Sequence, residues 1–588
     1  MLNKDFLSGH YQQTILSSLD EKKTVSSREL PSLVGSLCFS GRLLEAKKIY
    51  KDSYQTLNDT EKSACRFFIG LANTRKSQYS KASKIFRVNL KSLHKESDSL
   101  QKFYVYQGIA FYLFFVGKFE LSMKWGLKSF DAAMDARDLY ARSLSTDLLA
   151  HIKLRLGEIN VGIDLLKTAE KLSRQIGNKS VTEAMEISEL QYLAQYGYNR
   201  DNILTDLENK FNQFVSEDNY SRAAIGLELA RQYTLRGRYD LSENILEKIS
   251  SNIFATENRR QEIQLNIRFA ENYYQMGKSA LAWNYLRTAR RCLNFEADKS
   301  FEIQITGFEY KLFDESARAG LRQELKNKAR YFNTVINHNI LTRNHIEVGQ
   351  LFNHEDLYHN FLVSLETSAD KTAKIIESGY LSLLPDVLGF KRGESLLYFD
   401  QEASQVILFF DNKIEIPSTH LTPTDIKILV SILSGMKTKE ELCKKVWGYE
   451  YDPMRHDNII YTGIRSLRKS LGNGSNWIET SENGYQFSED RKFKINYRNQ
   501  NLESKKNENS VLLQDFAPMD SFSSELNLRQ IKSLQFLKQN ECLDVTSYQK
   551  LFEVSDVTAS RDLRTLKKLG FVISIGKARA IKYLLAQK

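Results

Sequence analysis

Residues 456–472 read HDNIIYTGIRSLRKSLG. Apolar residues recur through this stretch at the spacing of one helix face, at Ile460, Ile464, Leu467 and Leu471. Three cationic residues lie in its second half. A helix with this pattern buries its apolar stripe and turns its charged side outward. The stretch therefore predicts an amphipathic helix whose basic face needs an anionic ligand or solvent opposite it.

Two shorter helices are predicted before this one from their N-terminal caps. Thr422 precedes Pro423 at a first helical position, and Thr438 and Glu441 have the spacing of a capping box. The runs SLLYFD, QVILFF and NKIEI, between residues 395 and 416, are rich in β-branched and aromatic residues. They are separated by turn residues, so they predict a small antiparallel sheet.

After the basic helix, residues 477–487 (WIETSENGYQF) alternate like a hairpin that turns at Asn483–Gly484. A sheet, three helices and a hairpin, in this order, make a winged helix. The outward face of its third helix carries Asn458, Tyr461, Thr462, Arg465, Arg468 and Lys469. The alternative for the arginines is a solvated helix face without a ligand.

The stretches VWG, YDPMRHDNIIYTGIRSLRKSLG and WIETSENGYQF resemble the DNA-binding domain of OmpR/PhoB-type transcriptional regulators, over about residues 390–490. The resemblance implies that the third helix enters the major groove and that the wing touches the adjacent minor groove. It implies DNA contacts by Asn458, Tyr461, Thr462, Arg465 and Arg468 on the helix, and by Asn483 and Tyr485 on the wing. That family usually adds a receiver domain, but the chain shows no βαβ alternation. We therefore expect the input to come through other parts of the chain.

Residues 525–588 carry twelve Lys and Arg against six Asp and Glu, and they again run from helices to a hairpin. The run VSDVTASRDLRTLKKLG resembles the helix-turn-helix of DeoR-like regulators. The outward positions are Thr558, Arg561, Arg564, Thr565 and Lys568, and Lys577 and Arg579 flank the expected wing tip at Gly576. DNA contact is one interpretation, and a structural wing without a ligand is the other.

The first half of the chain carries glycines forty residues apart, at Gly117, Gly157, Gly197, Gly237 and Gly277. A small residue follows five positions later and a large apolar one nine positions later, as in GRYDLSENIL (237–246) and GKSALAWNYL (277–286). A glycine can end one helix in a left-handed cap, and a small residue lets the next helix approach closely. The pattern predicts helical hairpins stacked into a solenoid.

The versions at 41–50 and 77–86 resemble tetratricopeptide repeats, although the period is forty instead of thirty-four. An irregular helical bundle is the alternative. We expect a mainly α chain with a TPR-like α-solenoid at 1–300, a helical connector at 301–385 and a winged helix at 390–490. A linker at 491–524 and a second winged helix at 525–588 complete the prediction.

The formal net charge of +11 favours a polyanionic partner, with nucleic acid first and an acidic protein surface second. The five cysteines are odd in number and form no CxxC pair, which indicates a reducing cytosol and no zinc knuckle. No signal-peptide core begins the chain, and the longest apolar run, at 109–116, is too short for a membrane span. We expect a cytoplasmic protein.

Four histidines lie in the middle of the chain, at His338, His345, His354 and His359. Their gaps of seven, nine and five residues do not place two imidazoles on one helix face, so surface histidines are favoured over a metal site. The chain has no phosphate-binding loop, dinucleotide fingerprint or nucleophile elbow. We therefore expect no enzyme, no cofactor and no metal.

These features predict a bacterial transcriptional regulator that reads double-stranded DNA with two winged helices, while the repeats bind a protein, peptide or other signal. Asn458, Arg465 and Arg561 are expected to read base edges, and Lys469, Lys577 and Arg579 to contact phosphates. Two modest readers on one flexible linker would gain affinity from effective concentration. The alternative is an interaction scaffold whose winged helices dock proteins.

Overall fold

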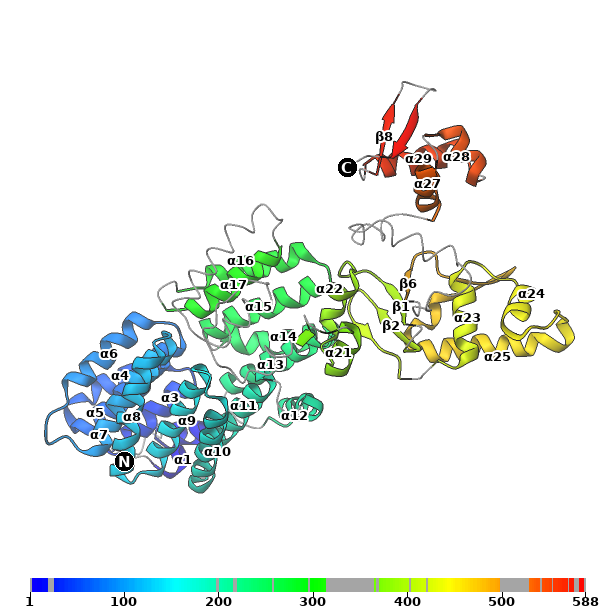
Figure 1. The fold of residues 1–588 in the computed structure, drawn as a ribbon. Coiled ribbons are helices and arrows are strands. Elements are labelled where there is room, and N and C mark those ends of the chain that lie inside the picture. Colours follow the sequence, from blue (N-terminus) through cyan, green and yellow to red (C-terminus); the bar gives the residue numbers. More distant parts are fainter. Residues whose placement is uncertain are drawn as a thin grey trace. The chain divides into compact units, whose positions relative to one another are not determined.

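The computed structural model describes most of the chain in two compact units, each treated by itself below (Figure 1). The first unit comprises residues 1–384, 392–399 and 404–495, and the second comprises 385–391, 400–403 and 496–588. The described residues are 3–18, 26–196, 200–214, 219–255, 258–294, 297–312, 364–365, 368, 370–400, 403–418, 421–496, 528–539, 542–552, 554–568, 571–575 and 581–585.

The N-terminal part of the first unit consists of helices that pack in consecutive pairs (Figure 1). Their bounds are α1 Lys4–Leu7, α2 Tyr11–Ser18, α3 Leu30–Phe39, α4 Leu43–Asp52, η1 Tyr54–Thr56, α5 Asp59–Arg75, α6 Tyr79–Lys91, α7 Ser99–Phe115, α8 Phe119–Ala136, α9 Leu139–Arg155, α10 Ile159–Ile176, α11 Lys179–Tyr196, α12 Arg200–Asn212, α13 Asn219–Leu235, α14 Tyr239–Ala255, α15 Arg259–Gln275, α16 Ser279–Arg291 and α17 Lys299–Leu312. The predicted helical repeat region is confirmed.

The forty-residue glycines end the first helix of a pair, as predicted. Gly117, Gly157, Gly237 and Gly277 all have positive φ, between 72° and 91°, and the next helix begins two residues later each time. A left-handed conformation at this position suits glycine because it has no Cβ. Gly197 lies outside the described residues.

The small residue five positions after each glycine permits close helix packing, also as predicted. Ser122, Ser242 and Ala282 have no exposed surface. At Gly162, an added Cβ would lie 2.4 Å from Cγ of Leu154. The repeat pattern therefore has a steric cause: the second helix of each pair passes too close to its neighbour for a larger side chain.

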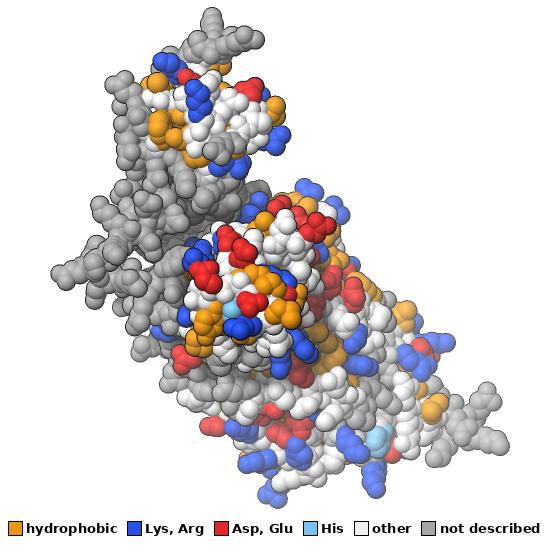
Figure 2. Space-filling view, turned by 90° about the vertical axis from the view of Figure 1, so that its right-hand side faces the viewer, with side chains coloured by type: hydrophobic (Ala, Val, Ile, Leu, Met, Phe, Trp, Pro, Cys, Tyr) orange, Lys and Arg blue, Asp and Glu red, His pale blue; other side chains and the backbone are white. Residues whose placement is uncertain are grey.

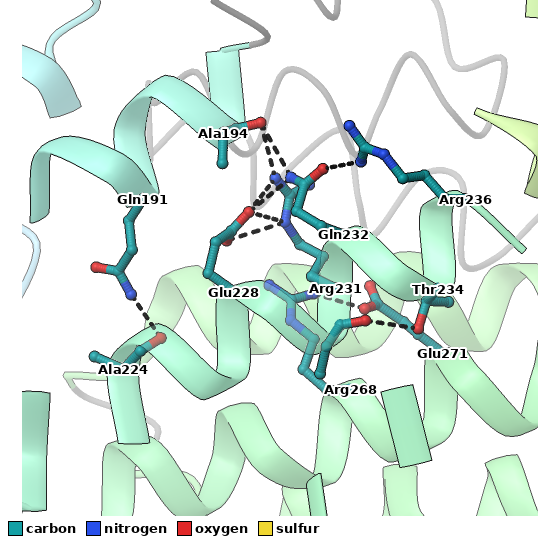
Figure 3. Close-up of polar contacts among 11 residues, drawn as sticks. Gln191, Ala194, Ala224, Glu228, Arg231, Gln232, Thr234, Arg236, Arg268 and Glu271 are labelled. Atoms are coloured by element: carbon teal, nitrogen blue, oxygen red, sulfur yellow. Dashed lines mark hydrogen bonds and ion pairs between the residues drawn. The ribbon is translucent and has the colours of Figure 1, made fainter. Parts of the chain in front are cut away.

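Neighbouring pairs are also joined by buried polar contacts, drawn in Figure 3 for α11, α13 and α15. Glu228, which is 3% exposed, accepts from Arg231 at 2.7 Å and from Gln232 at 2.9 Å. Gln232 also donates to the carbonyl oxygen of Ala194 at 3.1 Å, and Gln191 donates to that of Ala224 at 2.7 Å. Because buried polar groups are costly without partners, these bonds set how α11 and α13 pack.

The rest of the first unit contains α21 Lys371–Ser378, η2 Leu381–Leu383 and the start of α22 Leu384–Leu388, and then a winged helix. Its sheet has the order β3-β2-β1-β6, from β1 Leu396–Asp400, β2 Gln405–Phe409, β3 Ile414–Glu415 and β6 Lys492–Asn496. Three helical segments follow β3: α23 Pro423–Leu433, α24 Lys439–Leu442 with a π-helical continuation η3 Cys443–Trp447, and α25 Pro453–Leu471. A turn, η4 Gly472–Trp477, leads into the wing, β4 Ile478–Ser481 and β5 Gly484–Phe487.

The predicted capping box of Thr438 with Glu441 is present, and the predicted cap at Thr422 forms a second capping box with Asp425. The winged helix, however, extends beyond 490, into the predicted linker. The reason is that β6 carries apolar residues toward the domain: the Phe493 ring lies 5.6 Å from that of Phe487, and Ile495 packs against the core.

The second unit contains α27 Leu528–Gln539, β7 Leu543–Asp544, α28 Val545–Phe552, α29 Asp556–Lys568, β8 Val572–Ile575 and β9 Lys582–Leu585. Its sheet has the order β7-β9-β8. The predicted helices and terminal hairpin are present, and β7 adds a third strand by pairing Leu543 with Tyr583. Ala559, Leu563 and Leu566 point into its core, with no exposed surface.

Two further predictions fall partly or wholly outside the described residues. The four midchain histidines lie there, as does most of the linker. Within the described part of the chain, no helix is long and apolar enough to cross a membrane, and no group of His, Cys, Asp and Glu side chains could hold a metal ion.

Candidate nucleic-acid interface

The third helix of the first winged helix, α25, separates its residues into a buried and an exposed face. Ile460, Ile464, Leu467 and Leu471 are at most 2% exposed and pack in the core of the domain. The exposed face carries Asn458, Tyr461, Thr462, Arg465 and Lys469. The sequence pattern predicts an outward position for all five. In the structure they lie together on one side of the helix.

Arg465 and Lys469 are the cations of this face that remain available. In the described part of the chain, neither side chain has a hydrogen bond or an ion pair. The two residues lie one helical turn apart on the same side of α25. An uncompensated pair of exposed cations attracts phosphate or the acceptor edge of a base, and no internal bond must be broken before they can bind.

Arg468 lies differently from the other positions. Its side chain is half-buried, and Nη2 donates to the carbonyl oxygen of Ile478 at 2.7 Å and to Oγ1 of Thr480 at 2.9 Å. Nε donates to the same carbonyl at 3.2 Å. Arg468 therefore ties α25 to β4, the first strand of the wing, and fixes the angle between the two.

A polar cluster that the sequence did not reveal surrounds Tyr461. Nζ of Lys439, at the start of α24, donates to Oδ2 of Asp457 at 2.8 Å and to the hydroxyl of Tyr461 at 2.9 Å. The Tyr451 hydroxyl donates to the other Asp457 oxygen. The Lys439 and Tyr451 bonds lower the pKa of Asp457, and the Asp457 bond raises the pKa of Lys439. The cap at Thr438 predicts that Lys439 is the first residue of a helix. No local sequence pattern predicts that its side chain reaches α25.

The wing presents one of its two predicted residues. Asn483 is exposed in the turn, but Tyr485 is 2% exposed and packs in the core. The turn itself is Glu482–Asn483, because Ser481 pairs with Gly484. The predicted turn at Asn483–Gly484 is thus shifted by one residue.

Gly484 is the first residue of β5, and the chain is too crowded there for a side chain. Lys437 and Tyr485 exchange two backbone hydrogen bonds, of 2.8 and 2.9 Å, and a Cβ on Gly484 would lie 2.0 Å from the Lys437 carbonyl oxygen. The α23–α24 connection is therefore bonded directly to the wing.

In the second unit, α29 repeats this division of faces. Arg561, Arg564 and Lys568 are exposed, and none of these side chains has a hydrogen bond or an ion pair among the described residues. Thr558 and Thr565 are half-buried and bonded locally, to Ser555 Oγ at 3.0 Å and to the Arg561 carbonyl oxygen at 3.0 Å. The wing-tip residues Lys577 and Arg579 lie outside the described residues.

Asp562 on α29 is a buried charge with a structural role, unlike the exposed Arg561 beside it. It is 4% exposed and accepts from Arg529 Nε and from the Tyr548 hydroxyl, each at 3.1 Å. Burial and the neighbouring Asp562 carboxylate hold the pKa of Tyr548 above its usual range. Asp562 therefore joins α27, α28 and α29, which orients the exposed arginine next to it.

On the face of the molecule drawn in Figure 2, basic side chains lie among acidic and hydrophobic ones instead of forming a surface of one sign. Net charge alone therefore does not define the interface. The candidate interface is described instead by the exposed positions on α25 and α29.

Residues 417–487 match a family model described as "Transcriptional regulatory protein, C terminal". The match runs from just before α23 to the last residue of β5 and includes all of α25. It supports a DNA-binding domain of transcription regulators over these residues, which is a kind of domain without a catalytic role. No curated protein matches the chain.

Proposed function

We propose that the protein is a cytoplasmic bacterial transcription regulator whose first winged helix binds double-stranded DNA through the exposed face of α25. Asn458 and Arg465 would read base edges, and Lys469 would contact a phosphate, with Tyr461 and Thr462 beside them. Asn483 at the wing turn would reach the neighbouring groove. We leave the buried Tyr485 side chain out of this interface and give Arg468 the role of holding the wing.

The observation that carries this proposal is the exposure of Arg465 and Lys469 and their lack of partners among the described residues. They lie on the outer face of a helix whose inner face is buried in a domain of the matched family. Burial of the apolar face makes the helix rigid, so these cations are displayed at a fixed spacing. Because the backbone that carries them is already ordered, only the side chains lose conformational entropy on binding.

The second unit would act as a second reader through Arg561, Arg564 and Lys568, with Lys577 and Arg579 on its wing. Thr558 would lie near the DNA backbone. Two readers in one chain raise the local concentration of each other at a composite site, provided that the two subsites lie within reach of the linker. The match at 417–487 does not include this unit. The support for it is the helix pattern and the exposed arginines of α29, whose side chains have no partner among the described residues.

The helical repeats would be the receiving part of the regulator. Helical hairpins with the forty-residue glycine pattern resemble tetratricopeptide repeats, and stacked hairpins offer an extended surface for a protein or peptide. This role fits the lack of any recognisable receiver domain in the sequence.

The test is a salt titration of DNA binding by the full chain, on fragments selected from the genome of the source bacterium. Lys469→Ala should lower the slope of log affinity against log salt by about one, on any sequence, as expected for a lost phosphate contact. Arg465→Ala should cost about 1 to 3 kcal/mol on selected sites only. Arg87→Ala is the matched control, because Arg87 is an exposed arginine on α6 without a described partner.

Absence of salt-dependent binding to every fragment would overturn the proposal in favour of a protein-docking role for the winged helices. Equal losses for Arg465→Ala and Arg87→Ala would remove α25 from the interface.

A further inference from the structure

Within the first unit, two connecting loops of the helical repeats touch the first winged helix, one at strand β3 and one at the segment before β1. The carbonyl oxygen of Gly237, between α13 and α14, accepts from the backbone N–H of Ile414 in β3 at 2.8 Å. The backbone N–H of Asp240 donates to the carbonyl oxygen of Asn412 at 3.2 Å. These bonds pair the loop with the edge strand of the sheet, much as another strand would.

The loop of the next hairpin, forty residues later, makes the closer contact. A Cβ on Gly277 would lie 2.3 Å from the Arg392 carbonyl oxygen, and one on Gly393 would lie 2.4 Å from that of Met276. The Arg392 side chain donates to Oε1 of Gln275 at 3.0 Å and lies over the Tyr274 ring at 4.5 Å. We call the contacts of Gly237, Asp240, Gly277 and Gln275 with residues 392–414 the repeat dock.

The repeat dock is continuous with the end of α25. Glu415 follows Ile414 in β3, and its Oε2 accepts from Lys413 Nζ and from Asn473 Nδ2, each at 2.7 Å. Asn473 lies directly after Gly472, which ends α25. Burial opposes the charge on Glu415, but the bonds from Lys413 and Asn473, with the nearby Arg238 of the repeat loop, lower its pKa. The strand held by the repeats thus also holds the base of the helix.

The dock leaves the outer face of α25 accessible. No hydrogen bond, ion pair or ring contact in the described part of the chain joins Asn458, Thr462, Arg465 or Lys469 to the repeats. A blocking arrangement would cover these side chains. The contacts instead lie at the edge strand β3 and at the segment before β1, and β3 reaches the end of α25 through Glu415 and Asn473. From there they can set the position of α25 without competing for the same surface.

The dock also gives two repeat glycines a second role. Gly41 has the same left-handed backbone after a helix, with φ +81°, but nothing lies within 4 Å of the place where its Cβ would be. Gly237 and Gly277 have φ +73° and +72°, and both would drive a Cβ into the winged helix. Helix termination alone does not explain that crowding.

We propose that the repeat dock positions the first winged helix for DNA binding, so that the repeats influence DNA affinity through this contact. The inference rests on the proposed function. Gly277 and Arg392 are positioning residues because they join a repeat loop to the segment before β1. Glu415 is a third because it joins β3 to Asn473 at the base of α25. None of them lies on the surface that would meet DNA.

Gly277→Ala in the full chain tests the dock. Its Cβ would meet a backbone oxygen, so no side-chain rotation can relieve the clash. Gly41→Ala is the matched control, because it imposes the same strained backbone without a neighbour. Arg392→Ala is a milder second variant that removes the Gln275 bond and the Tyr274 contact without straining the chain.

Two quantities are measured on each variant: hydrogen exchange of the Ile414 amide, and affinity for DNA. We expect Gly277→Ala to speed Ile414 exchange by at least about tenfold, because the bond to Gly237 opens more often. We expect it to weaken DNA binding by about fivefold or more, the lower end of ordinary coupling between sites. Arg392→Ala should act in the same direction, and Gly41→Ala should change neither quantity.

Faster exchange with unchanged or tighter DNA binding would overturn the positioning role. Unchanged exchange in both dock variants would show that the contact does not hold β3, which also overturns the inference. If the unaltered protein binds no DNA at all, the proposed function fails first, and the exchange data still report on the dock alone.

Discussion

Nη2 of Arg468 donates to the carbonyl oxygen of Ile478 at 2.7 Å, and this bond joins the outer side of α25 to the wing. Arg465, one turn earlier on the same helix, has no hydrogen bond or ion pair in the described part of the chain. Two arginines three residues apart therefore differ in their surroundings: Arg468 is bonded inside the domain, whereas Arg465 is exposed and is proposed above to contact DNA.

Arg468→Ala should destabilise the first winged helix, because the Ile478 carbonyl loses its charged donor. The expected loss in the free energy of unfolding is about 1 to 2 kcal/mol. It is smaller than for a fully buried arginine because the Arg468 side chain is half-exposed. Arg465→Ala should leave stability within about 0.5 kcal/mol of the original. Denaturant unfolding followed by tryptophan fluorescence measures both, since Trp477 adjoins β4. Equal stability of the two variants would contradict the assigned roles.

Gly484→Ala should separate the wing from the α23–α24 connection. The new Cβ would lie 2.0 Å from the Lys437 carbonyl oxygen, on a backbone with φ +153°. We expect a loss of roughly 2 kcal/mol or more in stability and faster exchange of the Tyr485 amide. Gly435→Ala is the control, because Gly435 has φ +120° and open space around it. A similar loss in both would assign the effect to backbone strain alone.

The repeats should lose stability in mild alkali through His151. Burial disfavours its charged form, but Asp147 at 3.5 Å and the Tyr192 hydroxyl at 3.2 Å outweigh that and raise the pKa of His151 to about 9, from an ordinary 6.5. The raised pKa means that this stabilisation is complete below about pH 6.5 and is lost as the pH rises through about 9. The loss is at most about 3 kcal/mol.

Thermal unfolding of the full chain between pH 6 and about 10, followed by circular dichroism, checks this pH dependence. His151→Gln should remove most of the fall in melting temperature over that range, since glutamine does not titrate. An identical slope in the variant would show that another group is responsible.

Asp562→Ala should destabilise the second unit without removing any exposed cation. Both Arg529 and the buried Tyr548 hydroxyl lose an acceptor, and the expected cost is about 1 to 3 kcal/mol. The neighbouring substitution, Arg561→Ala, should instead leave folding unchanged and lower DNA affinity. The rate at which a protease cleaves the full chain within residues 528–585 measures the loss of stability, and a DNA titration measures the loss of affinity. Loss of stability in Arg561→Ala would contradict this division.

Local patterns in the sequence were sufficient for much of the fold. The apolar spacing at Ile460, Ile464, Leu467 and Leu471 predicts the buried face of α25, because a helix brings residues three and four apart to one side. The capping residues Thr422 and Thr438 predict where α23 and α24 begin. The forty-residue glycines predict the helix ends, since only glycine adopts a left-handed cap at little cost.

Tertiary contacts decided what single side chains do on those elements. Arg468 and Arg465 look alike in sequence, and only the approach of β4 makes one a structural donor. The family resemblance implies a DNA contact by Tyr485, but its side chain lies on the same face of β5 as Phe487 and packs in the core. The physical reason is range. Helix periodicity and caps depend on residues within one or two helical turns, whereas the partner of Arg468, the burial of Tyr485 and the second role of Gly277 depend on other elements that folding brings alongside.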